Sequence, residues 1–268
     1  MTHQFTVLMA VYAKDDIPYF QRAVLSVYEN TLLPSAMILV VDGPVLLELK
    51  SSIEALQSLY SFEVLWLPEN VGLANALNEG LKLVKTEWIA RADADDFNCP
   101  TRFEEQVRLS KCGFDLIGSA IKEVDKSGKN IAIRTLPTEH ADITKFARYR
   151  SPFNHMTVFF RTSLAKECGG YPQIYLKEDY GLWALMIKNG AKLVNTRDVL
   201  VVATAGRDMY KRRGGLVYAR AELDLQSHLV LCGIKGYFSA FFHGILRGGI
   251  FLLPSNIRGF IYKVFLRK

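Results

Sequence analysis

Three carboxylates lie within four residues where an apolar run ends, in the segment Arg91-Ala92-Asp93-Ala94-Asp95-Asp96. Like charges this close repel and shift one another's proton affinity, unless a cation lies among them. Hard divalent cations bind oxygen ligands, and enzymes often place such a cation beside a phosphate-bearing substrate. The spacing therefore favours a metal site. The alternative is an acidic surface turn that leads into the helix after Pro100.

Two more acidic positions could serve the same chemistry. Asp42 ends a second apolar run and precedes Gly43, where it either forms a tight turn or hydrogen-bonds a nucleobase or ribose. Glu178 and Asp179 begin a helical pattern. Acidic residues at a helix start either interact favourably with the helix dipole or supply a general base that faces a cleft.

The other candidates from the body of the chain are uncharged. Asn70 and Gly72 precede a helical pattern, either as a cap or as a loop where glycine lets the backbone approach a ligand. His155 is a candidate for a sugar pocket, although a lone histidine is more often structural, and Trp183 is a second candidate for that pocket.

Alternating strands and helices must position these side chains. Buried, strand-like runs occupy residues 5–12, 37–41, 62–67 and 88–92, and apolar residues recur at helical spacing in the intervals between them. Such a pattern predicts an α/β fold with a mostly parallel sheet and helices on both of its faces. Ligands of these sheets bind beyond the carboxyl ends of the strands, so Asp42 and the acidic segment would share one cleft.

Beyond Pro100 the pattern becomes mixed. Helices are expected at 103–109 and 182–188, and strands at 115–124, 157–160, 192–195 and 199–203. The apolar run after Cys232 is interrupted by His243 and Arg247, whereas a transmembrane helix needs ~20 largely apolar residues. The spacing predicts a basic amphipathic helix at 257–265, which would either lie in a bilayer interface or pack on the protein's own core.

The composition limits the classes of protein to be considered. With 268 residues, 50% of them apolar, the chain can build one large α/β domain, alone or with an appendage. Its four cysteines are far apart and form no CxxC pair, which argues against a zinc site or disulfide scaffold and favours a reducing compartment. No basic segment precedes the first apolar run, so no secretion signal is predicted.

The net charge of +6 is concentrated in the last part of the chain. From Arg207 to Lys268 there are eleven Lys or Arg against three Asp or Glu, a balance of +8, and the other 206 residues sum to −2. Lys211 and Arg212 lie there in a segment that is either a solvated loop or a loop folded over a diphosphate. An anionic membrane surface and nucleic acid are possible partners for such a charge. The basic residues alternate with apolar ones and form no nucleic-acid recognition module, which favours the membrane.

Taken together, the motifs resemble the family 2 glycosyltransferases, which have the GT-A fold and act with inversion. The resemblance spans residues 5–213 and rests on Ala10-Val11-Tyr12, Val41-Asp42-Gly43, Asn70-Val71-Gly72-Leu73-Ala74, the acidic segment and Glu178-Asp179. The segments 154–157 and 208–215 resemble the bacterial branch that builds O-antigen, capsular or amylovoran-type polysaccharide.

The resemblance implies a role for each matching position. Asp93 and Asp95 would form the DxD pair that binds Mn²⁺ or Mg²⁺, with Asp95 as the direct ligand, and Asp179, oriented by Glu178, would deprotonate the acceptor hydroxyl. Pro44 follows Asp42-Gly43 where many members have a serine, which leaves the details of base recognition open. The implied nucleotide-sugar contacts are Ala10, Val11, Tyr12, Asp42, Asn70, Gly72, Arg91, Asp93, Asp95, Lys211 and Arg212.

The resemblance also implies a domain organisation and an activity. Residues 1–205 would form the catalytic domain, with a nucleotide-sugar half at about 1–110 and an acceptor half at about 111–205, and residues 206–268 would form a basic loop and an amphipathic, membrane-associating tail. The enzyme would transfer a hexose, glucose or galactose, from a UDP-sugar to a polyprenyl-diphosphate-linked saccharide. It would act in the cytoplasm, at the inner face of the plasma membrane, and would bind no nucleic acid.

Two alternatives remain open from the sequence. A sugar-phosphate nucleotidyltransferase shares a similar nucleotide-binding sheet, but it usually has a glycine-rich, arginine-containing loop after the first strand, where this chain has Ala13-Lys14-Asp15-Asp16. A non-catalytic, membrane-peripheral sugar-binding protein could retain the fold without the activity. The intact acidic segment and Glu178-Asp179 argue against that second alternative.

Overall fold

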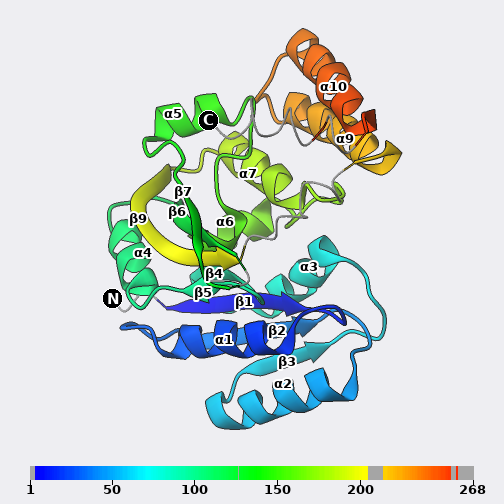
Figure 1. Ribbon diagram of the computed structural model, residues 1–268. Helices are drawn as coiled ribbons and strands as arrows, with labels where there is room; N and C mark the ends of the chain where they lie inside the picture. The colour runs from blue at the N-terminus through cyan, green and yellow to red at the C-terminus, as the bar shows by residue number, and fades with distance from the viewer. Residues whose placement is uncertain (1–3, 126, 205–213, 255–257, 259–268) are drawn as a thin grey trace.

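The computed structural model describes residues 4–125, 127–204, 214–254 and 258. Within them, nine strands form one sheet in the order β3-β2-β1-β4-β8-β6-β9-β5, with β7 beside β6 (Figure 1). The first four strands are β1 (Phe5–Val11), β2 (Ala36–Val41), β3 (Glu63–Trp66) and β4 (Trp88–Asp93), and they are parallel to one another. Ala10 pairs with Asp93 and Val11 pairs with Val41, so β1, β2 and β4 end together at one edge.

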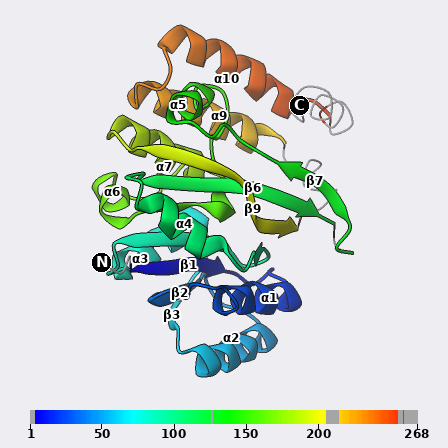
Figure 2. The ribbon, with the colours of Figure 1, turned by 90° about the vertical axis from the view of Figure 1, so that its left-hand side faces the viewer.

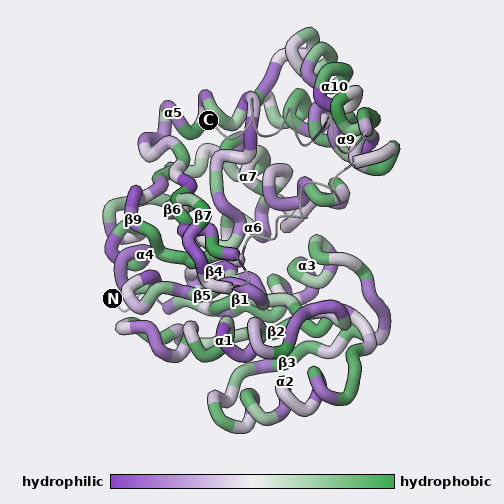
Figure 3. The backbone as a smooth tube through the Cα atoms, in the orientation of Figure 1, coloured by the Kyte–Doolittle hydropathy of each residue, from purple (hydrophilic) through white to green (hydrophobic). Residues whose placement is uncertain are grey.

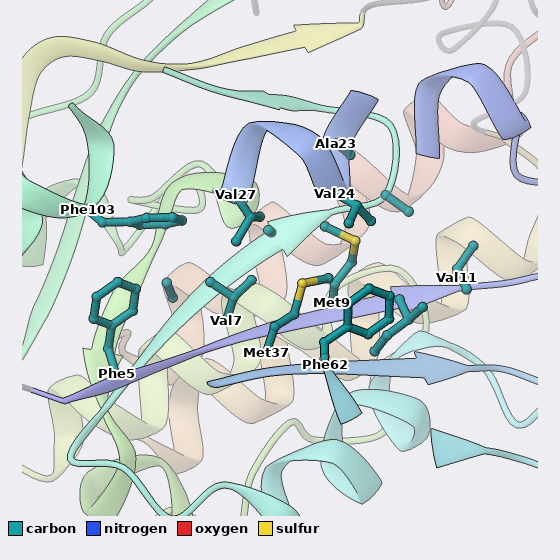
Figure 4. Close-up of a cluster of buried hydrophobic side chains, with 14 of the residues drawn as sticks. Phe5, Val7, Met9, Val11, Ala23, Val24, Val27, Met37, Phe62 and Phe103 are labelled. Atoms are coloured by element: carbon teal, nitrogen blue, oxygen red, sulfur yellow. The ribbon is translucent and has the colours of Figure 1, made fainter. Parts of the chain in front are cut away.

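Helices cover both faces of this parallel part, as the sequence predicts. Because side chains alternate along each strand, β1 sends Val7 and Met9 to one face and Leu8 to the other. The first face packs against α1 (Ile17–Tyr28), α2 (Leu47–Tyr60) and α4 (Arg102–Ser110), in the core that Figure 4 shows. The second face packs against α3 (Leu73–Leu83), α6 (Thr162–Glu167) and α7 (Glu178–Lys188).

The second half of the sheet is mixed, which corrects the expectation of a mostly parallel sheet. Its strands are β5 (Phe97–Asn98), β6 (Leu116–Val124), β7 (Asn130–Arg134), β8 (Phe159–Arg161) and β9 (Leu193–Thr204). β8 is antiparallel to both β4 and β6, β7 is antiparallel to β6, and β5 is antiparallel to β9, whereas β9 runs parallel to β6.

The two predicted strands at 192–195 and 199–203 are one strand, β9. Ser119 of β6 pairs with Thr196 and the next residue, Ala120, pairs with Val199, so Arg197 and Asp198 form a bulge in a continuous ladder. The polar bulge interrupts the apolar pattern without ending the pairing. The helices α5 (His140–Phe146) and α6 and the 3₁₀-helix η1 (His155–Thr157) were not predicted. The helix α9 (Leu216–Leu231) lies within the tail, residues 206–268, where amphipathic helices were expected.

Two helices of the basic tail form a hairpin that packs against α7. In Figures 1 and 2, α9 and α10 (Tyr237–Leu252) lie side by side, beyond α7 and far from β1–β3. Leu225 and Leu229 of α9 share a buried cluster with Tyr180 and Ala184 of α7, so α9 belongs to the core of the described domain. The predicted helix at 257–265 lies outside the described residues, except for Arg258.

The outer helix, α10, is largely hydrophobic along its length (Figure 3), and several of its apolar side chains are exposed to solvent. This exposed apolar face is mostly aromatic or branched aliphatic: Tyr237, Phe238, Phe241, Phe242, Ile245, Leu246 and Leu252 are all more than half exposed. Among the described helices, none combines the length and the hydropathy that crossing a bilayer requires. The exposed apolar face of α10 precedes residues 257–265, the segment where the sequence predicts an amphipathic helix.

Candidate active site

Arg91 lies at the centre of the site. Alternation along β4 places the side chains of Ile89, Arg91 and Asp93 on the face that packs against α3 and α7. Arg91 is 1% exposed and its Nη2 forms an ion pair with Oδ1 of Asp93. Its Nε and Nη1 are buried without a hydrogen-bond partner among the described residues. Such donors carry a desolvation cost that an anionic ligand would offset.

The carboxylates of Asp93, Asp95 and Asp96 form an acidic triad beyond β4. One oxygen from each lies within 4.8 Å of the others. Burial and the Asp93 charge raise the pKa of Asp95 to about 6, and burial with both neighbours raises the pKa of Asp96 well above its ordinary value. Three converging carboxylates are the donor set that Mg²⁺ and Mn²⁺ prefer, so these residues fit the predicted cation. When bound, the cation would stabilise negative charge on a diphosphate.

The DxD pair implied by the resemblance left out Asp96, and Asp15 had been given no role from the sequence. Asp96 is 5% exposed and its Oδ1 accepts a hydrogen bond from the Thr204 amide at 3.1 Å, which ties the triad to the end of β9. Asp15 follows β1 and its Oδ2 accepts from the Tyr12 amide at 2.9 Å. Burial, with Asp95 and Asp93 nearby, raises the pKa of Asp15 to about 6. The signal for Asp15 was its position directly after a strand end that faces the cleft.

Asp42 holds the loop that precedes α3. Its Oδ1 accepts from the Val71 amide at 2.7 Å, and its Oδ2 accepts from the Gly72 amide at 3.1 Å and from Asn70 Nδ2 at 3.0 Å. Asp42 is only 6% exposed. Its observed role is therefore to fix the 70–72 loop beside the ends of β1 and β2, and its contact with a base or ribose stays a prediction.

Replacement of Gly43 by alanine is expected to displace this loop. Gly43 has a φ of +87°, and a Cβ there would lie 2.5 Å from the Asn70 backbone nitrogen. Backbone strain and the clash are each expected to lower the free energy of unfolding by about 1–3 kcal/mol. Urea unfolding measures the loss. Gly128→Ala is the matched control, because Gly128 has a φ of +81° with no atom within 4 Å of a new Cβ. Equal losses for both variants would show that the close approach is unimportant.

A buried polar network connects β4 to η1 on the far side of the acidic triad. Arg102 is completely buried, and its Nη2 donates to the Arg91 carbonyl at 2.6 Å while its Nε donates to Gln106 Oε1 at 3.1 Å. Gln106 Nε2 donates in turn to the Thr157 carbonyl at 2.6 Å. Burial and the neighbouring Arg91 lower the pKa of Arg102 to about 9. The network fixes the position of His155 relative to Arg91.

Glu178 and Asp179 lie at the N-terminus of α7, next to Arg91 and His155. Glu178 is 8% exposed, and burial together with the Asp179 charge raises its pKa to about 7. His155 is half-buried, and burial with the nearby Arg91 lowers its pKa to about 4, so its ring is neutral at pH 7. Its Nε2 lies 3.3 Å from the Tyr171 hydroxyl.

A cavity of about 1240 Å³ opens in front of these groups. It is bounded by β7, η1, α7, α9 and α10, and its lining includes His155, Glu178 and Asp179. Neither the acidic triad nor Asp42 lines it. The site thus has two compartments: the strand ends with the triad on one side, and this cavity on the other. Arg91 lies between them, close enough to affect the pKa of both Asp95 and Glu178.

The structure corrects one site prediction and leaves others untested. Trp183 has no exposed surface and lies behind His155, with the ring centroids 6.1 Å apart, so it does not line the cavity. Ala10 and Tyr12 lie at the exposed end of β1, whereas the Val11 side chain is buried in the core. Lys211 and Arg212 fall outside the described residues.

Comparison with known proteins identifies the family. The sequence profile described as Glycosyl transferase family 2 matches residues 6–169, more than half of the chain. The chain belongs to this family. A UDP-Gal:alpha-D-GlcNAc-diphosphoundecaprenol beta-1,3-galactosyltransferase of Escherichia coli is 35% identical over 270 residues, covering 100% of this chain and 98% of the relative. The amylovoran biosynthesis glycosyltransferase AmsE of Erwinia amylovora is 32% identical over 261 residues, covering 97% of this chain and 98% of the relative.

A solved structure confirms the fold. The mannosyltransferase PcManGT of Pyrobaculum calidifontis, in complex with GDP-Man and Mn²⁺, matches with a TM-score of 0.66 at 16% identity, covering 96% of this chain and 74% of that chain. The family 2 glycosyltransferase described here therefore has the predicted GT-A fold.

Proposed function

We propose that this family 2 glycosyltransferase transfers a hexose, with galactose favoured over glucose, from a UDP-sugar to a lipid-diphosphate-linked saccharide in the synthesis of a bacterial surface polysaccharide. The observation that supports this proposal most strongly is the position of two acidic groups, the triad and the Glu178–Asp179 pair, on either side of the buried Arg91. The name of the E. coli relative, which matches over the whole chain, supports the donor, the sugar and the acceptor class.

On the donor side, the acidic triad would hold Mn²⁺ or Mg²⁺ beside the diphosphate. Arg91 would donate its two unpartnered N–H groups to phosphate oxygens, which would also offset the cost of burying them. The loop fixed by Asp42 would shape the nucleotide pocket. Lys211 and Arg212 would fold over the diphosphate and neutralise developing charge on the leaving group.

On the acceptor side, Asp179 would act as the general base, with Glu178 shaping its surroundings. Asp179 accepts the proton of the acceptor hydroxyl, the hydroxyl oxygen forms a bond to the anomeric carbon, and UDP departs with the electron pair of the broken bond. Attack from the face opposite to the leaving group inverts the configuration in a single displacement.

The exposed face of α10 would place the enzyme on the inner surface of the plasma membrane. This face would bind the interface of an anionic bilayer, because its exposed side chains are aromatic and aliphatic. The surrounding segment from Arg207 to Lys268 also has a net charge of +8. The same helix lines the cavity through Arg247 and Phe251, so the membrane-bound acceptor would lie next to the catalytic groups.

Replacement of Phe238 and Phe242 by serine is expected to weaken binding to anionic vesicles by roughly 10- to 100-fold. A fully buried phenylalanine contributes about 1.5–3 kcal/mol, and an interfacial helix inserts its side chains only partly, so the expected loss is smaller than the sum of two full contributions. Both side chains are exposed, at 78% and 67%, so the fold should be retained. Sedimentation with vesicles measures the effect. A matched replacement of the exposed Leu47 and Leu59 on α2 should leave sedimentation unchanged, and an equal loss there would argue against a specific α10 surface.

Acidification is expected to weaken cation binding by the triad. A carboxyl group that keeps its proton offers no charge to a cation, and the pKa of Asp95 is raised to about 6. The apparent Mn²⁺ affinity should therefore fall between about pH 7.5 and about pH 5.5. Below the pKa of a carboxyl group that must ionise to bind the cation, the affinity should decrease by up to about tenfold for each pH unit. Calorimetric titration at several pH values tests this. A dissociation constant that is the same across the range would contradict the assignment.

The function itself is tested with purified protein, a panel of UDP-sugars, Mn²⁺ and a synthetic GlcNAc-diphosphate-lipid. Transfer that stops with EDTA, giving one product mass and linkage, supports the proposal. If neither transfer nor metal-dependent hydrolysis of any UDP-sugar occurs, the non-catalytic alternative is favoured. Release of pyrophosphate from UTP and a sugar 1-phosphate would instead identify a nucleotidyltransferase.

A further inference from the structure

The turn that leads into α7, the helix that carries the proposed base, has an unusual backbone at Leu176. Leu176 has a φ of +55°, and in the part of the chain that the structure describes Ser61 is the only other non-glycine residue with a positive φ. Leucine strongly disfavours this left-handed conformation, which persists only where the surrounding structure holds it. The strained residue lies three positions before Asp179, so whatever holds this turn also affects the position of the base.

The turn folds back onto the first residues of α7. The Gly181 amide donates to the Lys177 carbonyl at 2.9 Å, which forms the first turn of the helix. Gly181 lies so close to the preceding chain that a Cβ there would lie 2.4 Å from Pro172 Cγ. A different backbone at Leu176 would redirect the chain at Lys177 and displace the start of α7, which carries Asp179.

A buried carboxylate of α9 holds the side chain that follows Leu176. Lys177 Nζ lies 3.5 Å from Glu222 Oε2 and 5.7 Å from the centre of the Phe251 ring. The Glu222 carboxylate is itself fixed, because its Oε1 accepts from Gln226 Nε2 at 2.8 Å and lies 3.3 Å from Arg247 Nε. Glu222 is completely buried and does not line the cavity, so it can affect the reaction only through other residues.

We propose that Glu222 is a positioning residue. Through its ion pair with Lys177 it holds the left-handed turn at Leu176, and the turn in its place keeps Asp179 where it can accept the proton of the acceptor hydroxyl. This inference rests on the proposed function. The α9–α10 hairpin thereby contributes to catalysis through a residue that does not touch the substrate. Leucine populates the left-handed conformation about 5- to 30-fold less than glycine does, and this ratio limits the loss expected when the ion pair is removed.

Glu222→Gln tests the ion pair, because it removes the charge and keeps the size of the side chain. The kcat for sugar transfer is expected to fall by about 5- to 30-fold, while the dissociation constant of UDP in the presence of Mn²⁺ is unchanged. Leu176→Gly, added to Glu222→Gln, should restore most of kcat, since glycine adopts the left-handed backbone without help. The matched control is Ser61→Gly in the same background. Ser61 also has a φ of +55°, but it ends α2, on the opposite face of the sheet from α7, so it should not restore kcat.

Hydrogen exchange examines the turn without any substrate. In Glu222→Gln the backbone amides of residues 175–181 are expected to exchange faster than in the unaltered protein, and amides of the α2 segment should be unaffected. If the unaltered protein transfers no sugar, the proposed function fails, whereas exchange rates in Glu222→Gln that equal those of the unaltered protein show that Glu222 does not hold the turn.

The kinetic outcomes also separate the proposal from a purely structural role. A normal kcat in Glu222→Gln would overturn the proposal and show that packing of the turn on Gly181 is sufficient. Equal restoration of kcat by Leu176→Gly and Ser61→Gly would contradict it as well, because that result reports general stability. Loss of kcat that neither substitution restores would place the effect of Glu222 outside the turn.

Lys177→Met takes the place of Glu222→Gln if the latter fails to fold, since Arg247 then still pairs with Glu222. The same loss of kcat and the same restoration by Leu176→Gly are expected in this background. Leu176→Gly cannot replace a substrate contact of Lys177, so a loss that it does not restore would count against the proposal.

Discussion

Replacement of Asp95 by asparagine is expected to lower the transfer rate by roughly 10²–10⁴-fold, because it removes a charge from the cation site without changing the size of the side chain. Asp95 is the exposed member of the triad, whereas Asp93 is paired with Arg91 and Asp96 is buried beneath the Thr204 amide. Its carboxylate is therefore the one most accessible to a cation that also contacts a substrate. Initial rates over a range of Mn²⁺ concentrations measure the loss.

The control for this experiment is Asp224→Asn, which makes the same chemical change at an exposed position on α9. It should keep both the rate and the Mn²⁺ affinity of the unaltered enzyme. If Asp95→Asn transfers sugar at the normal rate at every Mn²⁺ concentration, the triad does not hold a catalytic cation and the donor side of the proposal is wrong.

The second large effect is expected for Asp179→Asn. A general base contributes about 10²–10⁴-fold to a rate, so kcat should fall by that factor while the affinity for UDP is retained. Asparagine has the same shape and keeps a polar group at the N-terminus of α7, so the helix should persist. Rates of transfer and the dissociation constant of UDP, measured on the same preparation, separate the two quantities.

Glu178→Gln distinguishes the two neighbouring carboxylates. Burial raises the pKa of Glu178 to about 7, so a substantial fraction of this group keeps its proton at neutral pH. If Asp179 is the base, Glu178→Gln should have the smaller effect on kcat. A larger loss of kcat in Glu178→Gln than in Asp179→Asn would show that Glu178, not Asp179, is the base. Full activity of Asp179→Asn would show that Asp179 has no part in the mechanism.

The parallel half of the fold, and the edge at which Asp42 and the acidic triad lie, were predictable from the sequence. The runs that became β1, β2 and β4 are largely apolar, and the helices between them keep a regular spacing. Asp42 follows β2, and β4 ends at Asp93. These signals are local, so they can be recognised without knowing which strands pair. Because parallel strands end at a common edge, Asp42 and the acidic triad were correctly expected there.

The antiparallel strands could not be predicted in the same way. The strand predicted at 157–160 overlaps β8, but β5 has only two residues, too few to show a period. Neither segment shows in its sequence that it pairs antiparallel with its neighbours. The bulge at Arg197 and Asp198 made β9 look like two strands, although its ladder with β6 continues. Trp183 was a candidate for the sugar pocket, yet packing against Phe153 and Phe160 removes it from the surface.

The sequence alone determined the family, the topology of the first four strands and the residue types needed at the two acidic groups, because each of these is encoded within a short stretch of chain. Tertiary structure alone decided that Asp15 lies close to the acidic triad, and that Glu222 forms ion pairs with both Lys177 and Arg247. The physical reason is that burial and charge pairing depend on segments far apart in the chain, whose meeting no local pattern records.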